Sequence, residues 1–193
     1  MRSIRALLCF ITLVTLHRMN AQQLPYYEIP ESPKEYTAGT VAGRMIDGLG
    51  FRYYWATEGL TEENLQYAPG DKTRSIRETL DHILGLSVMT LSALEGKEVV
   101  FPSVKELSFE ALRKQTLENL KKSSDILKES KDISMFTMKM RRGNQVAEYP
   151  FWNQLNGPIG DALWHVGQVV SFRRSAGNPL PKGVSLLTGT VKK

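Results

Sequence analysis

Residues 76–94 carry apolar side chains on most sides of the helix that their pattern predicts, and this segment constrains the fold most strongly. The helix has a defined start, because Ser75 and Glu78 form the S-x-x-E pattern of a capping box. Gly96 marks its end. A helix that is apolar nearly all round must be covered by other elements. The segment therefore predicts the central helix of a bundle.

Three further segments show helical periodicity. The first begins at Thr40 and ends near Gly59. Its predicted apolar stripe is Val41, Met45, Leu49 and Tyr53, and Ile46 and Trp55 widen it. The next covers residues 109–128 behind Ser108 as N-cap, and it is polar enough to have one exposed face. Together with residues 76–94 and a last helical segment, these patterns predict an all-α domain, a four-helix bundle.

The last helical segment lies within residues 151–176. Proline is best tolerated in the first turn of a helix, so Pro158 predicts a regular helix that starts near Asn156 or Gly157. Gly177 then serves as the C-terminal cap. Two arginines at the end of this helix, Arg173 and Arg174, are expected to be solvated and to interact with the helix dipole.

The segment before the last helix has a different period. Phe136, Met138 and Met140 alternate with polar residues, which is the pattern of a strand. A turn sequence, Arg142-Gly143-Asn144, follows directly. We therefore expect a small hairpin or an irregular excursion at this point of the bundle.

The first 21 residues read as a secretory signal peptide. Arg2 and Arg5 precede a short apolar run, and Ala21 offers a small residue before a cut at Gln22. A signal anchor is the alternative, although an apolar run of this length is short for a membrane span. The expected organisation is a signal peptide at 1–21, an extended proline-containing segment at 22–39, the bundle at 40–180 and a C-terminal tail at 181–193. The mature protein would be exported, to a periplasm or to the outside of the cell, with no stable membrane span.

Removal of the signal peptide changes the composition of the chain. The only cysteine, Cys9, is lost, which excludes a disulfide and a thiolate ligand within the mature protein. Three arginines are lost as well, leaving 22 basic against 20 acidic residues, a formal charge of +2 instead of +5. The remaining basic residues are interleaved with acids, so the sequence predicts no nucleic-acid surface.

Two side chains of the last helix point to a metal site. Asp161 and His165 are four residues apart, so a helix places them one turn apart on the same face, and Gln168 continues that face. A carboxylate and an imidazole beside a core-facing stripe are typical ligands inside a helix bundle. The mature chain has one other histidine, His82, in the central helix.

The order of these elements resembles the DinB-like superfamily of metal-binding four-helix bundles. The resemblance covers residues 40–180 and is carried by A-T-E-G-L-T-E-E-N-L (56–65), S-I-R-E-T-L-D-H-I (75–83), H-V-G-Q (165–168) and R-R-S-A-G-N-P (173–179). Members have one histidine on the second helix and an H-x-x-x-H pair on the last. His82 and His165 match two of these positions, while Asp161 stands where many members have histidine.

The resemblance and the residues together predict a divalent-metal site formed by His82, Asp161 and His165, with positions left for water or substrate. Zn²⁺ is the first choice, and two histidines with one carboxylate also suit Fe(II), with Ni and Mn as further alternatives. Gln168 is expected either to orient a metal ligand or to form a structural hydrogen bond. Tyr53, Tyr54 and Trp164 are candidates to line the open side, with core packing as the alternative for the tyrosines.

Two classes of function follow from the resemblance. The first is a metal-dependent enzyme acting on a small molecule, either a hydrolase or a thiol-dependent transferase. Glu58 and Glu78 are the candidates for its general base. The second is a non-catalytic bundle, which binds a metal or a small molecule or forms a structural homodimer. Solvent access to the metal distinguishes the two classes, because a catalytic site keeps a coordination position open.

Overall fold

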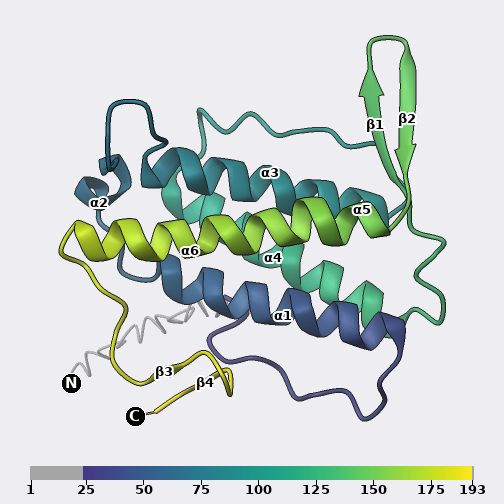
Figure 1. Cartoon of the computed structure of the whole chain (residues 1–193), viewed down its shortest axis with the longest axis horizontal. Helices are drawn as coiled ribbons and strands as arrows, with labels where there is room; N and C mark the ends of the chain where they lie inside the picture. Colours follow the sequence, from purple (N-terminus) through teal and green to yellow (C-terminus); the bar gives the residue numbers. More distant parts are fainter. Residues whose placement is uncertain (1–23, 193) are drawn as a thin grey trace, which may run out of the picture.

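The computed structural model describes residues 24–192 and is mostly helical (Figure 1). Its four long helices are α1 (Ala38–Thr57), α3 (Ile76–Leu94), α4 (Phe109–Glu129) and α6 (Gly160–Ser175). Shorter helical pieces are α2 (Glu62–Gln66), α5 (Trp152–Gln154) and the π-helical segment η1 (Leu155–Ile159). Two small antiparallel hairpins pair β1 (Met138–Arg142) with β2 (Gln145–Tyr149), and β3 (Val184–Ser185) with β4 (Thr190–Val191).

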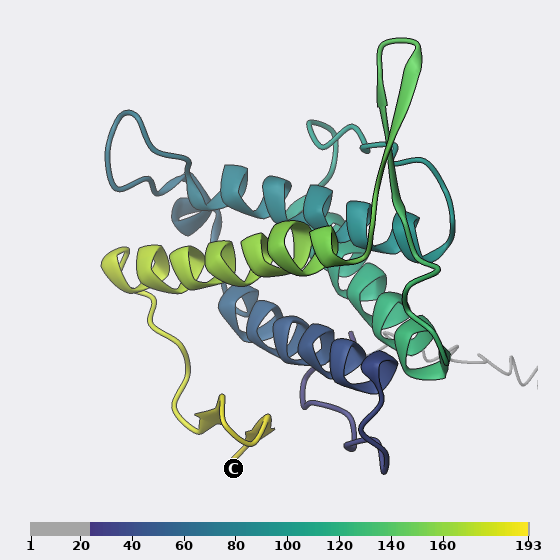
Figure 2. The ribbon, with the colours of Figure 1, turned by 45° about the vertical axis from the view of Figure 1, so that its right-hand side comes forward.

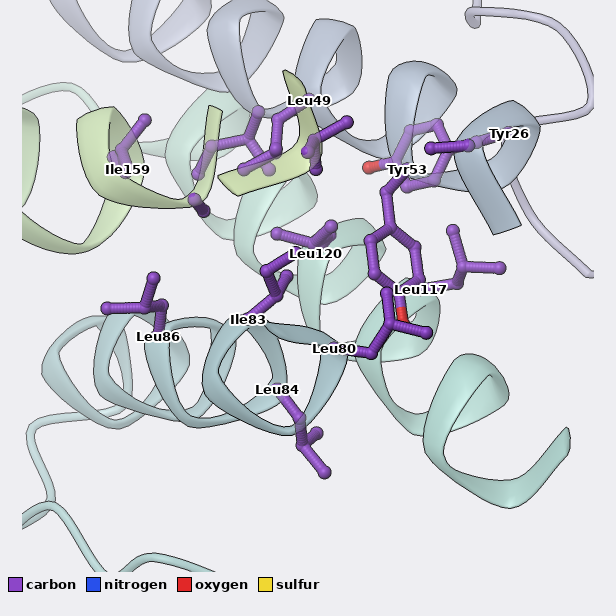
Figure 3. Packing of buried hydrophobic residues seen from close by; sticks show 14 of the residues in the cluster. Tyr26, Leu49, Tyr53, Leu80, Ile83, Leu84, Leu86, Leu117, Leu120 and Ile159 are labelled. Atoms are coloured by element: carbon purple, nitrogen blue, oxygen red, sulfur yellow. The ribbon is translucent and has the colours of Figure 1, made fainter. Parts of the chain in front are cut away.

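The four long helices pack around one core. α1 packs against α4 and α6, and α3 packs against the same two helices, as Figures 1 and 2 show from two directions. The side chains between them are fully buried, and Figure 3 shows Tyr53, Leu80, Ile83 and Leu117 among them. Truncating such a leucine to alanine typically costs about 2–5 kcal/mol of stability. None of the helices in residues 24–192 is both long enough and apolar enough to traverse a bilayer.

Local signals place the ends of the helices. Ser75 caps α3, accepting a hydrogen bond from the Glu78 backbone N–H at 3.1 Å, while the Glu78 carboxylate accepts one from the Ser75 N–H at 2.8 Å. This is the predicted capping box. Gly96 and Gly177 follow α3 and α6 with φ of +69° and +77°, conformations that favour glycine. The bounds of the helices at 76–94 and 109–128 are confirmed to within a residue.

The apolar stripe predicted for the first helix is wrong in part. Val41 and Met45 are 48 % and 43 % exposed, whereas the predicted Ile46, Leu49 and Tyr53 are buried in the core. Glycines determine this rotation, because they let α1 approach α4 closely. A Cβ on Gly39 would lie 2.2 Å from the Leu127 carbonyl oxygen, so no larger residue fits there. The glycine face of α1 therefore turns toward α4, and Val41 and Met45 turn outward.

The last helical segment lies within the predicted range, but its regular part starts later than predicted. Helical structure begins at Trp152 and continues through η1, and the regular helix α6 starts at Gly160 rather than near Asn156 or Gly157. Gly157 departs from helical geometry, with φ −97° and ψ −106°, immediately before Pro158. Proline has no N–H to donate to the preceding turn, so the helix widens here instead of continuing as a regular α-helix. Pro158 thus marks an irregular turn inside the segment and not its beginning.

The hairpin expected before the last helix is confirmed as β1 and β2, with the turn at Gly143 and Asn144. Residues 181–193, expected to be a tail, contain a second small hairpin up to Val191. This hairpin contacts the segment before α1, where the Ile29 N–H donates to the Gly189 carbonyl at 2.9 Å. The predicted signal peptide at 1–21 lies outside the described residues.

The prediction that Arg173 is solvated at the end of the last helix is wrong. Its side chain is buried, and its guanidinium donates to the carbonyl oxygens of Trp55 at 2.8 Å, Ala56 at 3.0 Å and Asn178 at 2.6 Å. The same residue thus joins the end of α1 to the turn after α6. Desolvation by burial lowers its pKa, but a guanidinium remains charged at any physiological pH.

Candidate metal centre

Three side chains of the described residues that could hold a metal ion converge between α3 and α6: His82, Asp161 and His165. His82 Nε2 lies 3.1 Å from Asp161 Oδ2, and His165 Nε2 lies 3.3 Å from Asp161 Oδ1. The two imidazole rings meet edge to face, with their centroids 4.6 Å apart. The predicted convergence of these three residues is therefore present in the structure.

Helix geometry explains this arrangement. Asp161 and His165 are one turn apart on α6, so both face α3, where His82 lies on a neighbouring turn. The segment η1 immediately precedes Asp161 and carries the irregular turn at Gly157 and Pro158. Such π-helical turns shift the face that the following helix presents, and they occur often at functional sites. The irregular turn thus lies directly before the helical turn that carries Asp161.

Gln168 orients one of the imidazoles. Its Oε1 lies 2.7 Å from His165 Nδ1, one turn further along α6. An amide oxygen only accepts hydrogen bonds, so Nδ1 is the donor in this contact. The other ring nitrogen, Nε2, faces the Asp161 carboxylate at 3.3 Å, an arrangement that a cation between the two groups would stabilise. This contact is the one expected of a hydrogen-bond partner that orients the His165 ring.

The donor set and its dimensions fit a divalent metal. All three ligand atoms lie within 4.8 Å of one another. Ligands about 2.1 Å from a tetrahedral metal are roughly 3.4 Å apart, and the two observed carboxylate–imidazole distances are 3.1 and 3.3 Å. Two imidazole nitrogens with one carboxylate oxygen suit zinc and several first-row transition metals.

The group is accessible from solvent. The side chain of His165 is 13 % exposed, whereas those of His82 and Asp161 are 32 % and 39 % exposed. A groove of about 360 Å³ also borders His82 on the outer side of α3. Closed structural zinc sites use four protein ligands, whereas this group offers three ligands with partial exposure. The arrangement therefore leaves room for a molecule from solvent.

Other residues considered from the sequence have different roles. Glu58 forms an ion pair with Arg113 at 2.5 Å, and Glu78 caps α3, so neither belongs to the His82, Asp161 and His165 group. Tyr53 is fully buried in the core, which excludes it from an open lining. Tyr54 packs in an aromatic cluster with Tyr27 and Trp55, and Trp164 is 72 % exposed.

The groove beside His82 was missed from the sequence. Its outer wall comes from the connection between α3 and α4, at Phe101, Pro102 and Val104. A signal for it exists, because Val99-Val100-Phe101 is an apolar run within a connection that has no helical or strand period. Apolar residues in such a connection indicate a segment that lies against another surface.

Two comparisons of this chain with known proteins identified no similar family or protein. Neither a scan against protein-family models nor a search of curated proteins found a match for this chain. The candidate centre is therefore characterised by its own residues: two imidazoles and a carboxylate, brought together by two helices and partly exposed to solvent.

Proposed function

We propose that this chain is an exported, DinB-like metal-binding protein that holds a divalent metal at His82, Asp161 and His165. The observation that carries this proposal is the convergence of the three ligand atoms within 4.8 Å, contributed by two helices that are far apart in the sequence. The four-helix packing and the Gln168 contact to His165 support it. Zn²⁺ is the proposed metal, and Fe, Ni or Mn are the alternatives.

The proposed activity is metal-dependent chemistry on a small molecule. A divalent metal held by His82, Asp161 and His165 would lower the pKa of a coordinated water or thiol and polarise a substrate, which suits a hydrolase or a thiol-dependent transferase. Partial exposure of His82 and Asp161 supports access by a substrate. For an exported protein, hydrolysis has the advantage that it needs no cytosolic thiol.

A non-catalytic binder of a metal or small molecule is the second candidate, and one observation favours it. Both glutamates considered as a general base are engaged elsewhere, Glu58 with Arg113 and Glu78 in the cap of α3. Without a base, the metal and its ligands would have to perform any proton transfer. Turnover of model esters and amides by metal-loaded protein separates the two candidates.

Metal content and affinity test the proposal. Protein purified without added metal or a histidine tag should contain about one divalent ion per chain by elemental analysis, as expected for a single site. Calorimetric titration of the metal-free protein measures the Zn²⁺ affinity. Loss of a hydrogen-bond partner of a metal ligand lowers metal affinity by roughly 10- to 100-fold, and His82→Ala and His165→Ala should each lower it by more than this. Glu118→Ala is the control, since this acid forms an exposed ion pair with Lys114. Unchanged Zn²⁺ affinity in both histidine variants would refute the site.

Export is tested separately. Mass spectrometry of the native protein should show an N-terminus near Gln22, as expected after signal-peptide removal. Full-length protein with Met1, recovered from the cytosol, would contradict the proposed localisation. Light scattering of the purified chain tests the homodimer that the sequence leaves open.

A further inference from the structure

The connection between α3 and α4 is held as a strap across the outer side of α3. At its start, the Val99 N–H donates to the Lys139 carbonyl at 2.9 Å, and Glu98 forms an ion pair with Arg141 of β1. At its other end, the Arg77 guanidinium donates to the carbonyl oxygens of Val104 at 3.1 Å and Leu107 at 2.8 Å. The strap, residues 97–107, is therefore fixed at both ends.

A groove of about 360 Å³ lies between this strap and α3. Its floor is a stripe of α3 residues one turn apart, His82, Gly85 and Met89, and its outer wall includes Phe101 and Val104. Pockets that bind small molecules typically measure about 300–1,000 Å³ and are mostly apolar with a few polar groups. The groove fits this description, and His82 borders both the groove and the candidate metal centre.

Gly85 keeps the floor of the groove low. It lies inside α3, where glycine costs about 1 kcal/mol relative to alanine. Its backbone is not in the left-handed region, and a Cβ added there would contact only the Phe101 ring, at 3.6 Å. Neither helix geometry nor helix packing therefore requires glycine at this position, and the lack of a larger side chain leaves the floor beside His82 open.

The charges around the groove indicate the class of ligand. Apart from His82, Asp81 is the only titratable residue that the described part of the chain contributes to the lining. Its carboxylate accepts a hydrogen bond at 2.9 Å from Arg77, the residue that also anchors the strap. The rest of the lining is apolar, with Leu86, Met89 and Phe101. Such a surface favours an uncharged apolar or aromatic group over a carboxylate or a phosphate.

We propose that this groove binds the apolar body of a small ligand whose metal-coordinating end reaches the His82, Asp161 and His165 centre. The inference rests on the proposed function, because it needs a metal at that centre. It adds the substrate class: an uncharged aliphatic or aromatic molecule with one end able to coordinate a metal, such as a carbonyl compound or a thiol.

Hydroxamates of different tail length test this assignment, since they coordinate divalent metals through two oxygens. The Co²⁺-loaded protein is titrated with acetohydroxamate and with 4-phenylbutanohydroxamate, and the visible spectrum of Co²⁺ reports binding. Burial of the phenylpropyl tail in the groove should strengthen binding by about tenfold or more over acetohydroxamate. In Gly85→Leu, which fills the floor, this gain should be lost while acetohydroxamate binds as in the wild type.

Two further variants keep the test independent of folding. Gly85→Ala adds one methyl group at an ordinary contact distance from Phe101 and should retain most of the gain. Phe101→Ala removes a wall residue that is 54 % exposed, so the fold should persist while the gain decreases. Equal affinity of the wild type for both hydroxamates would refute the groove as a binding site. An undiminished preference of Gly85→Leu and Phe101→Ala for the longer hydroxamate would refute it as well. If the wild type binds no Co²⁺, the proposed function fails and this inference fails with it; if Co²⁺ binds and the tail adds nothing, only the groove is refuted.

Discussion

Two aspartates of this protein, Asp47 and Asp161, have opposite surroundings. Asp47 lies on α1 and is fully buried, and its carboxylate accepts hydrogen bonds from Ser124 at 2.6 Å, Lys128 at 2.5 Å and Tyr26 at 3.2 Å. Asp161 lies on α6 with its side chain 39 % exposed, and it faces the imidazoles of His82 and His165. The first acid is compensated by a cation of the protein itself.

The difference separates a structural polar cluster from a ligand set. At Asp47, the protein provides both the positive charge and the donors, as a buried carboxylate requires. Burial next to the Asp47 carboxylate raises the pKa of Tyr26, so its phenol remains a protonated donor. At Asp161, the groups that face the carboxylate are potential metal ligands themselves, so an external cation would complete the proposed site. The two regions should therefore respond differently to mutation and to metal.

The largest effect on stability is expected at the buried cluster around Asp47. Lys128→Met leaves the Asp47 carboxylate buried without its cation, which should destabilise the fold by about 3 kcal/mol, the lower end of the range for breaking a buried ion pair. For a chain of this size, such a loss corresponds to a melting temperature lower by about 6–12 °C. Thermal melts measure this, and Zn²⁺ affinity should stay at the wild-type value.

Lys114→Met is the matched control for that variant. Lys114 pairs with Glu118 at 3.7 Å on the surface, with both side chains about half exposed. Loss of an exposed pair typically changes stability by less than about 1 kcal/mol. Equal destabilisation by the two substitutions would show that burial does not distinguish the Asp47 cluster.

An intermediate effect is expected at Gln168, this time on metal affinity. Gln168→Leu removes the acceptor for His165 Nδ1, and loss of such a partner typically lowers metal affinity by about 10- to 100-fold. Calorimetric titration with Zn²⁺ measures the change. Gln168→Glu keeps an acceptor at the same place and should retain affinity. If both variants bind Zn²⁺ like the wild type, the contact is structural only.

The smallest effect is expected from exchanging the ligand type at Asp161. Asp161→His creates a set of three imidazoles and should keep or raise Zn²⁺ affinity, because imidazole suits zinc well. The stability of the metal-free protein should change by less than about 1 kcal/mol, since the carboxylate is partly solvated. Zn²⁺ titration and melts with and without metal test both expectations. Loss of binding in this variant would show that Asp161 does not belong to the ligand set as proposed.

The sequence by itself determined the local structure of this protein. The capping box at Ser75 and Glu78, the glycines after α3 and α6, and the alternating residues of β1 act over a few residues, so pattern analysis could place these elements. The spacing of Asp161 and His165 likewise decides that they share a face on any helix.

Only the tertiary structure decided which faces meet. Val41 and Met45 point outward because Gly39 lets α1 approach α4, and Arg173 is buried because the turn after α6 and the end of α1 offer it carbonyl oxygens. His82 and Asp161 are 79 positions apart, and their 3.1 Å contact depends on the packing of α3 against α6. Such contacts arise between segments distant in the sequence, and no local pattern encodes them, because the free energy of packing depends on all the surfaces that come together.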